Sequence, residues 1–185
     1  IQPHFLYNTL ATIAELCHND SAMAEEVTKH FSLYLRGNLE HMSDSFPVDF
    51  SKELKHVQTY LWIEKIRFGD ELQVVYDIQT EDFLIPALTM QPLVENSVKY
   101  GMMGSENVCT ITISTKCVKK GYQVIIEDDG AGFAPDEVKK DGRKHIGIDS
   151  VRSRLKYMVG GTLTISSEIG KGTKVVIEIP GKEEA

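Results

Sequence analysis

Apolar residues recur at helical spacing through the first third of the chain. They follow one another mostly at intervals of three and four positions, which places them on one face of a helix. This stripe consists of Leu6, Leu10, Ile13, Cys17, Ala24, Val27, Phe31 and Tyr34. The polar residues 19–21 interrupt it, and Asp20 or Ser21 can cap a new helix. We therefore predict helix here, with a break or kink at 19–21.

A second helical stripe follows the polar residues 37–47, which predict a turn. This second helix is expected to run from about Ser51, its N-cap, to Phe68. Its apolar face carries Leu54, Val57, Leu61 and Ile66. Two helices joined by a turn form a hairpin, and one hairpin alone cannot bury both apolar faces. A second copy would complete a four-helix bundle, so the pattern predicts a homodimer.

The pattern changes after Glu71, where apolar and polar residues alternate over 72–78 as in a strand. A helix is expected from Pro86 to about Tyr100, strands over 110–115 and 122–127, a helix over 151–158 and a last hairpin over 163–167 and 174–179. These elements predict one mixed sheet with helices on one face. The boundary falls near Gly69, which divides the chain into a helical hairpin, 1–69, and an α/β part, 70–185. The fold class is α+β.

Composition and charge narrow the function. The chain has 185 residues, 27 acidic and 20 basic, for a net charge of −7. This balance argues against a nucleic-acid partner, because binding phosphate backbones takes clustered Lys and Arg. No apolar run approaches the roughly 20 residues that cross a bilayer, so we expect no membrane contact in this part. The chain begins at Ile1, and we interpret it as a piece of a longer protein.

One candidate site is the segment 128–132, which reads Asp-Asp-Gly-Ala-Gly directly after an apolar strand. The carboxylate of Asp128 can accept a hydrogen bond from an amino group such as that of adenine. Gly130 and Gly132 let the backbone approach a flat ligand closely. Taken alone, the segment is equally compatible with a plain turn.

Two further candidates lie on predicted helices. Asn96 and Lys99 share a helix face, where an amide oxygen can ligate magnesium and an ammonium group can neutralise phosphate. Glu95 and Lys99 could instead form a surface pair. Near the chain start, His4 and Asn8 are one turn apart, so Asn8 could orient the imidazole ring. A lone histidine in a helix is more often structural.

A fourth candidate is Gly147, which opens a helix after His145 and the basic residues 142–144. Free N–H groups at a helix start can bind an anion, and the preceding residues could cover phosphates. An ordinary connecting loop is the alternative.

Together, these motifs resemble the catalytic core of LytS-type sensor histidine kinases. The matching segments are QPHFLYNTL (2–10), YLWIEKIRFGDEL (60–72), IPALTMQPLVENSVKYG (85–101), EDDGAGF (127–133), IGIDSVRSRL (146–155) and GKGTKVVIEIP (170–180). The resemblance implies a dimerisation and histidine-phosphotransfer hairpin followed by a Bergerat-type ATP-binding domain. It also implies ATP and Mg²⁺, a response-regulator partner, and a cytoplasmic location in a bacterial protein anchored in the membrane upstream.

The resemblance also assigns roles to residues. His4 would accept the phosphoryl group, Asn96 would ligate magnesium and Asp128 would bind the adenine amino group. The nucleotide boxes would be formed by Gly130, Gly132, Gly147 and Thr173.

The chain departs from the family pattern at the glycine box and after the phosphoacceptor. His145 replaces a usual Gly, and Ser150 stands where the family usually has Asn. Phe5 follows His4 where many histidine kinases have an acid, so the base is sought in Asn8 or Glu95. Two alternatives to an autokinase remain at this point: a non-catalytic dimerising relay that binds nucleotide or nothing, and an ATPase with Glu95 as base.

Overall fold

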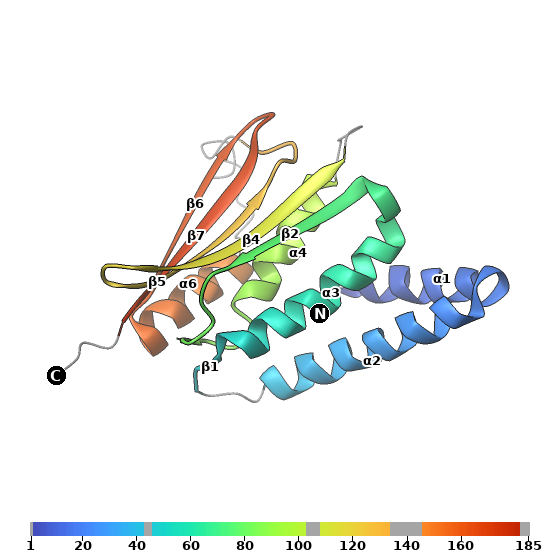
Figure 1. Cartoon of the computed structure of the whole chain (residues 1–185), viewed down its shortest axis with the longest axis horizontal. Coiled ribbons are helices and arrows are strands. Elements are labelled where there is room, and N and C mark those ends of the chain that lie inside the picture. Colours follow the sequence, from blue (N-terminus) through green and yellow to red (C-terminus); the bar gives the residue numbers. More distant parts are fainter. Residues whose placement is uncertain (1, 43–45, 103–107, 134–145, 182–185) are drawn as a thin grey trace.

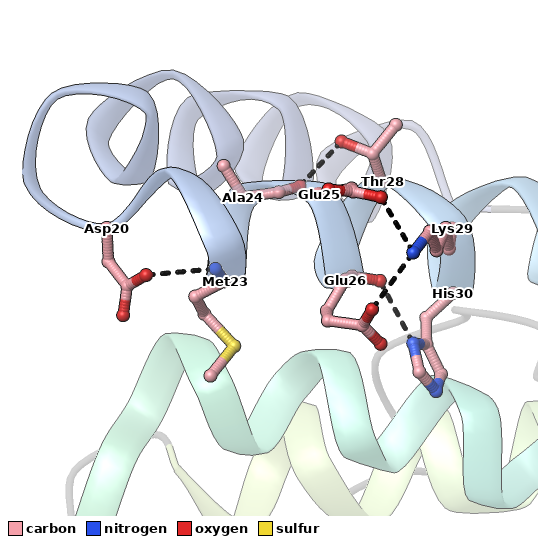
Figure 2. A network of polar contacts seen from close by, with 8 residues as sticks. All are labelled: Asp20, Met23, Ala24, Glu25, Glu26, Thr28, Lys29 and His30. Atoms are coloured by element: carbon pink, nitrogen blue, oxygen red, sulfur yellow. Dashed lines mark hydrogen bonds and ion pairs between the residues drawn. The ribbon is translucent and has the colours of Figure 1, made fainter.

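The computed structural model describes residues 2–42, 46–102, 108–133 and 146–181 (Figure 1). Its first part is helical: α1 (Pro3–Asn19), α2 (Ser21–Met42) and α3 (Phe50–Phe68). The chain turns back at Asp20, so that α2 runs beside α1. The Asp20 carboxylate accepts the N–H of Met23 at 3.0 Å in the first turn of α2 (Figure 2). The predicted break is thus confirmed, and it is a reversal of the chain with a side-chain cap.

The apolar stripe of α2 is buried within this single chain, without the second copy that the sequence pattern called for, while that of α1 is largely not. Ala24, Val27, Phe31 and Tyr34 all lie in the core. On α1 the buried residues are Phe5 and Thr9, and Leu10 remains 54% exposed. The ring of Phe5 contacts Tyr34 and Tyr60, with centroids 4.8 and 4.9 Å apart. The face of α1 that packs inside this chain is therefore one position away from the expected face.

Five strands form the mixed sheet in the order β2-β4-β5-β7-β6. They are β2 (Leu72–Ile78), β4 (Cys109–Val118), β5 (Gly121–Asp128), β6 (Thr162–Glu168) and β7 (Gly172–Pro180). β2 and β4 are parallel and the other pairs are antiparallel. Helices α3, α4 (Met90–Gly101) and α6 (Ile146–Val159) lie on one face of this sheet (Figure 1). The predicted α+β class and the one-sided helical layer are confirmed.

The helical part and the sheet part share one hydrophobic core. Val57 and Leu61 of α3 belong to the same buried cluster as Leu93 of α4 and Ile111 of β4. A small second sheet also joins the parts, because β1 (Val48–Asp49) pairs with β3 (Leu84–Ile85). The proposed boundary near Gly69 falls at a short 3₁₀ turn, η1 (Gly69–Glu71), where Gly69 has φ +56°. The connection is therefore tight, with packing across it.

Three helix bounds differ from the predictions, and the first is the end of α2, which continues to Met42 into the predicted turn 37–47. α3 begins at Phe50 after Asp49, one residue before the expected cap Ser51. α4 begins at Met90 instead of Pro86, because residues 86–89 form a turn in which Leu88 has φ +54°. At the other end of α4, Gly101 is the last helical residue and Met102 is the cap. No helix in the described part of the chain is both long and apolar enough to cross a membrane.

Candidate functional site

A cleft of about 720 Å³ brings together three of the predicted catalytic residues. His4 and Asn8 reach it from α1, and Glu95 and Lys99 reach it from α4. Residues of α3 complete its wall. The cleft therefore lies where the helical part meets the sheet part, and residues about 90 positions apart in the sequence face the same space.

His4 is exposed in the first turn of α1 and contacts Asn8. The amide nitrogen of Asn8 lies 3.0 Å from Nδ1 of the His4 ring. Pro3 precedes His4 at a position where the missing N–H costs nothing, because no intrahelical acceptor exists there. The expected ring-orienting contact between Asn8 and His4 is thus present.

Glu95 is buried, unlike a residue of a solvated helix face. Its Oε1 accepts a hydrogen bond from the Tyr34 hydroxyl at 3.1 Å and another from the Gln91 amide at 2.7 Å. Gln91 in turn contacts Nε2 of the buried His56 at 2.7 Å. Burial and the Glu95 carboxylate raise the pKa of Tyr34, so its hydroxyl stays a donor. A network over α2, α3 and α4 therefore fixes the Glu95 carboxylate.

Asn96 and Lys99, both on α4, differ in how exposed their side chains are. Lys99 is exposed and lines the cleft beside His4, with its ammonium 4.9 Å from the Tyr100 ring centroid. Asn96 is half-buried. Within residues 2–42, 46–102, 108–133 and 146–181, no three His, Cys, Asp or Glu side chains cluster as a metal site. Mg²⁺ accepts one or two protein oxygens, with water and phosphate as its other ligands, so the Asn96 amide oxygen suits such an ion.

Asp128 ends β5 as a buried carboxylate. Its Oδ1 accepts the N–H groups of Gly130 at 3.3 Å and Thr173 at 3.2 Å. Burial raises the pKa of Asp128, and hydrogen bonds from Ser97, Gly130 and Thr173 oppose that shift. Three predicted nucleotide-binding residues, Asp128, Gly130 and Thr173, therefore meet at one end of the sheet.

The glycines after Asp128 are required for packing. A Cβ on Gly130 would collide with the backbone of Gly101 at the end of α4. Gly132 has φ +61°, and a Cβ there would overlap the carbonyl group of Glu168. The sequence reading of this segment as a tight turn is thus compatible with a ligand site, because both need a backbone without side chains.

The surroundings of Gly147 differ from those of Gly130 and Gly132. It is exposed in the first turn of α6, and a Cβ on it would meet none of the described atoms within 4 Å. Packing inside the described chain therefore does not explain a glycine at this position. His145 and the basic residues 142–144 lie outside the described residues.

The structure adds cleft residues that sequence reasoning missed. Glu64 and Arg67 of α3 line the same cleft as His4. They stand three positions apart in the segment 60–72, and such a pair resembles any surface ion pair of a helix. Tyr34 and Gln91 were also missed, because only the tertiary packing brings them to Glu95. The apolar stripe around Glu64 was the available signal, since a charge within it is expected to be buried.

Two family models match the chain. Residues 1–72 match the histidine kinase model, and residues 82–183 match the model of histidine kinase-, DNA gyrase B-, and HSP90-like ATPases. The second match covers more than half of the chain. The chain therefore belongs to the histidine kinase-, DNA gyrase B-, and HSP90-like ATPase family.

Curated relatives agree with this assignment. The uncharacterized protein YwpD of Bacillus subtilis (strain 168) is 39% identical over 95% of this chain. Sensor histidine kinase YpdA of Escherichia coli (strain K12) is 34% identical over 98% of this chain. Sensor protein LytS of B. subtilis (strain 168) is 29% identical over 97% of this chain. The chain spans 65% of the length of YwpD, 33% of YpdA and 32% of LytS. The resemblance to LytS-type kinases is confirmed.

Solved structures show the same fold. The histidine kinase domain of the Erythrobacter litoralis EL346 blue-light activated histidine kinase superposes with a TM-score of 0.59 at 17% identity, covering 92% of this chain and 93% of that one. Acinetobacter baumannii histidine kinase AdeS superposes with a TM-score of 0.56 at 20% identity. The match covers 86% of this chain and 81% of the AdeS chain. At these identities the likeness concerns the fold.

Proposed function

We propose that this chain is the catalytic core of a sensor histidine kinase. It transfers the γ-phosphoryl group of ATP to His4, and His4 passes the group to an aspartate of a response regulator. The observation that carries the proposal is the cleft at which His4 of α1 faces Glu95 and Lys99 of α4, in a chain of this ATPase family. Such a cleft can hold a nucleophile, a base and a cation together, which is what phosphoryl transfer needs.

Asn8 sets the tautomer of His4 in this mechanism. In the structure the amide nitrogen of Asn8 faces Nδ1. A 180° turn of the amide group presents its oxygen instead, and Nδ1–H then donates to that oxygen while Nε2 keeps a free lone pair. Neutral imidazole is a competent nucleophile near pH 7. Nε2 then bonds to the γ-phosphorus as the bond from phosphorus to the ADP oxygen breaks, and ADP keeps that electron pair.

Glu95 is the proposed base for the ring proton that remains after this attack. Its Oε1 is held by Tyr34 and Gln91, so the carboxylate is already oriented at the cleft. The proton leaves Nδ1, which Asn8 contacts, and reaches Glu95 through water. Lys99 is proposed to neutralise the transferring phosphoryl group, and its place in the same cleft as His4 supports this role.

The remaining predicted residues are assigned to the nucleotide. Asp128 would accept the adenine amino group, with Gly130, Gly132 and Thr173 forming the pocket wall around it. Gly147 would let α6 approach the phosphates, and its open surroundings support this. Asn96 would ligate Mg²⁺, which supplies charge neutralisation at the phosphates.

The proposed partners are a response regulator receiver domain and a second copy of this chain. Apolar side chains stay exposed on α1 and α2, namely Tyr7, Leu10, Leu33 and Leu39. They support dimerisation through the helical part, 1–69, while the ATP-binding part, 70–185, carries the nucleotide. The full-length protein is proposed to be anchored in the bacterial membrane upstream, with this part in the cytoplasm. Neither the non-catalytic relay nor the simple ATPase is favoured by any observation in the described chain.

Labelling with γ-labelled ATP and Mg²⁺ tests the proposal. Wild type should gain acid-labile, alkali-stable label, which is the signature of phosphohistidine. His4→Gln should lose the label and keep ATP binding. His18→Gln is the matched control, because His18 is exposed on the same helix, and it should be labelled normally. His145→Gln should retain label too. Normal labelling of His4→Gln would overturn the assignment.

A further inference from the structure

Glu64 and Arg67 form an ion pair in the wall of the His4 cleft. Nη1 of Arg67 donates to Oε1 of Glu64 at 3.2 Å, and Nη2 lies 2.8 Å from Oε2. The Glu64 side chain is 2% exposed and that of Arg67 is 23% exposed. Buried ion pairs contribute little net stability, because removing both charges from water offsets their attraction. Stability alone therefore does not account for this pair.

The pairing of Glu64 is incomplete. Oε2 is buried and lies 2.8 Å from Nη2 of Arg67, but it accepts no hydrogen bond from the described residues. Burial raises the pKa of Glu64 to about 7, with Glu95 adding to the shift and Arg67 opposing it. The carboxyl group can therefore bind a proton near neutral pH and release Arg67.

Phosphorylation of His4 would change the charge in this cleft. A phosphoryl group adds a charge close to −2 to a space already lined by two carboxylates, those of Glu64 and Glu95. Two cations are available there, Arg67 from α3 and Lys99 from α4. The guanidinium of Arg67 is a planar fork that matches phosphoryl oxygens with two hydrogen bonds, and it stacks on Phe68 at 4.0 Å.

We propose that Arg67 exchanges partners when His4 is phosphorylated, leaving Glu64 and binding the phosphoryl group. Glu64 then takes a proton from the buffered solvent, so its negative charge no longer opposes the phosphoryl group. Arg67 is thus the phosphoryl-binding residue, and Glu64 is a positioning residue that holds Arg67 before transfer. This inference rests on the proposed function, because it requires a phosphorylated His4. The other charged or titratable groups among the described residues of this cleft are His4, Tyr60, Arg67, Glu95 and Lys99. Tyr34, which does not line the cleft, is close enough for the Glu64 charge to raise its pKa.

Two variants with different expected effects test the exchange. The measurement is the equilibrium constant for label transfer between ATP and His4, from label levels at fixed ATP-to-ADP ratios. Arg67→Gln should lower it about tenfold, because the phosphoryl group loses a charge-assisted hydrogen bond. Glu64→Gln should leave it unchanged or raise it, because Arg67 no longer has a competing anion. A purely structural ion pair would make both variants change in the same direction, which would overturn the proposal.

Two control variants distinguish the positive charge of Arg67 from the shape of its guanidinium group. Arg67→Lys keeps the charge but lacks the fork, so the equilibrium constant should fall between those of wild type and Arg67→Gln. Arg152→Gln removes an arginine that pairs with Asp149 at the same i,i+3 spacing on the exposed face of α6, and it should behave as wild type. Equal losses in Arg67→Gln and Arg152→Gln would count against the exchange.

A second experiment phosphorylates the protein chemically, so its result does not depend on kinase activity. Phosphoramidate phosphorylates histidine without ATP, and the ³¹P resonance of phospho-His4 is identified by its absence in His4→Gln. A nearby cation favours the doubly charged phosphoryl group, so the ³¹P titration midpoint should rise in Arg67→Gln and not in Glu64→Gln. If wild type takes no label from ATP, the proposed function fails, and this titration still decides the exchange. Identical midpoints in wild type and Arg67→Gln would overturn it.

Discussion

Glu53 of α3 caps the start of α4 by accepting the N–H of Leu88 at 2.6 Å. Its other oxygen accepts the N–H groups of Thr89 and Met90 at 3.0 and 3.1 Å. From the opposite side, Arg154 of α6 donates to the carbonyl groups of Ala87 and Leu88. This turn before α4 is therefore clamped between α3 and α6, which fixes the helix that carries Glu95 and Asn96.

Glu53→Gln should destabilise the fold by about 3 kcal/mol, because a buried carboxylate that accepts three backbone N–H groups becomes a neutral amide. One amide N–H would also face a backbone donor. Urea unfolding measures the change. Glu25→Gln is the matched control, since Glu25 pairs with Lys29 at 2.8 Å on the exposed face of α2 (Figure 2). It should unfold as wild type does, and an equal loss in both variants would contradict the clamp.

Asp128→Asn should weaken ATP binding about tenfold with little loss of stability. The N–H groups of Gly130 and Thr173 can still donate to the amide oxygen, whereas the adenine amino group would lose a charged acceptor. Calorimetry measures the affinity. Asp129→Asn is the control, because Asp129 is the exposed neighbouring carboxyl and accepts the Thr110 N–H at 2.6 Å. Unchanged affinity in Asp128→Asn would remove Asp128 from the site.

Gly130→Ala should lower the thermal stability of the fold, whereas Gly147→Ala should lower the affinity for ATP and leave stability unchanged. At Gly130 the new methyl group collides with the Gly101 backbone, so the melting temperature should fall by several degrees. At Gly147 the methyl group meets none of the described atoms within 4 Å, so stability should stay unchanged while ATP affinity falls. Thermal unfolding and calorimetry on both variants check this. Wild-type ATP affinity in Gly147→Ala would place this glycine outside the nucleotide site.

The periodicity of the sequence predicted most elements, but it could not choose which face of α1 packs inside the chain. Leu6 and Leu10 define one apolar face, and Phe5 defines another. Only the aromatic rings of Tyr34 and Tyr60, supplied by other helices, select Phe5 for the interior. Local spacing carries no information about which neighbour will cover a face.

The candidate site was predictable where it depends on local motifs. Asp128 and Thr173 were found 45 residues apart, and their contact follows from the register of β5 on β7, where they are paired. The apolar stripe signals that Glu64 is buried, but it does not identify the residues of α1 and α4 that share the cleft with it. Residues that act through tertiary contacts therefore stayed hidden, and those within strand-end motifs did not.

Glu64 should make the fold less stable as pH rises. Its pKa is about 7 in the folded state, against an ordinary value of 4.5 in the unfolded chain. Between these values the folded state binds more protons than the unfolded state, so the free energy of unfolding falls with increasing pH and levels off above about 7. The effect is at most about 3 kcal/mol. Glu64→Gln should be more stable than wild type at pH 8, with the difference vanishing near pH 4.5. If the unfolding free energies of wild type and Glu64→Gln, measured with urea, change in parallel with pH, the raised pKa of Glu64 is contradicted.

Tyr34→Phe should slow phosphorylation of His4 about tenfold and leave ATP affinity unchanged. The phenyl ring keeps the packing against Phe5 and His56, while Glu95 loses one of the two hydrogen bonds that orient its carboxylate. Single-turnover labelling separates the rate from binding. Tyr60→Phe is the matched control, because Tyr60 is equally buried at the same cleft and the hydrogen bonds of Glu95 come from Tyr34 and Gln91. If both variants slow labelling equally, the loss reflects helix packing, and Glu95 is not the group that Tyr34 positions.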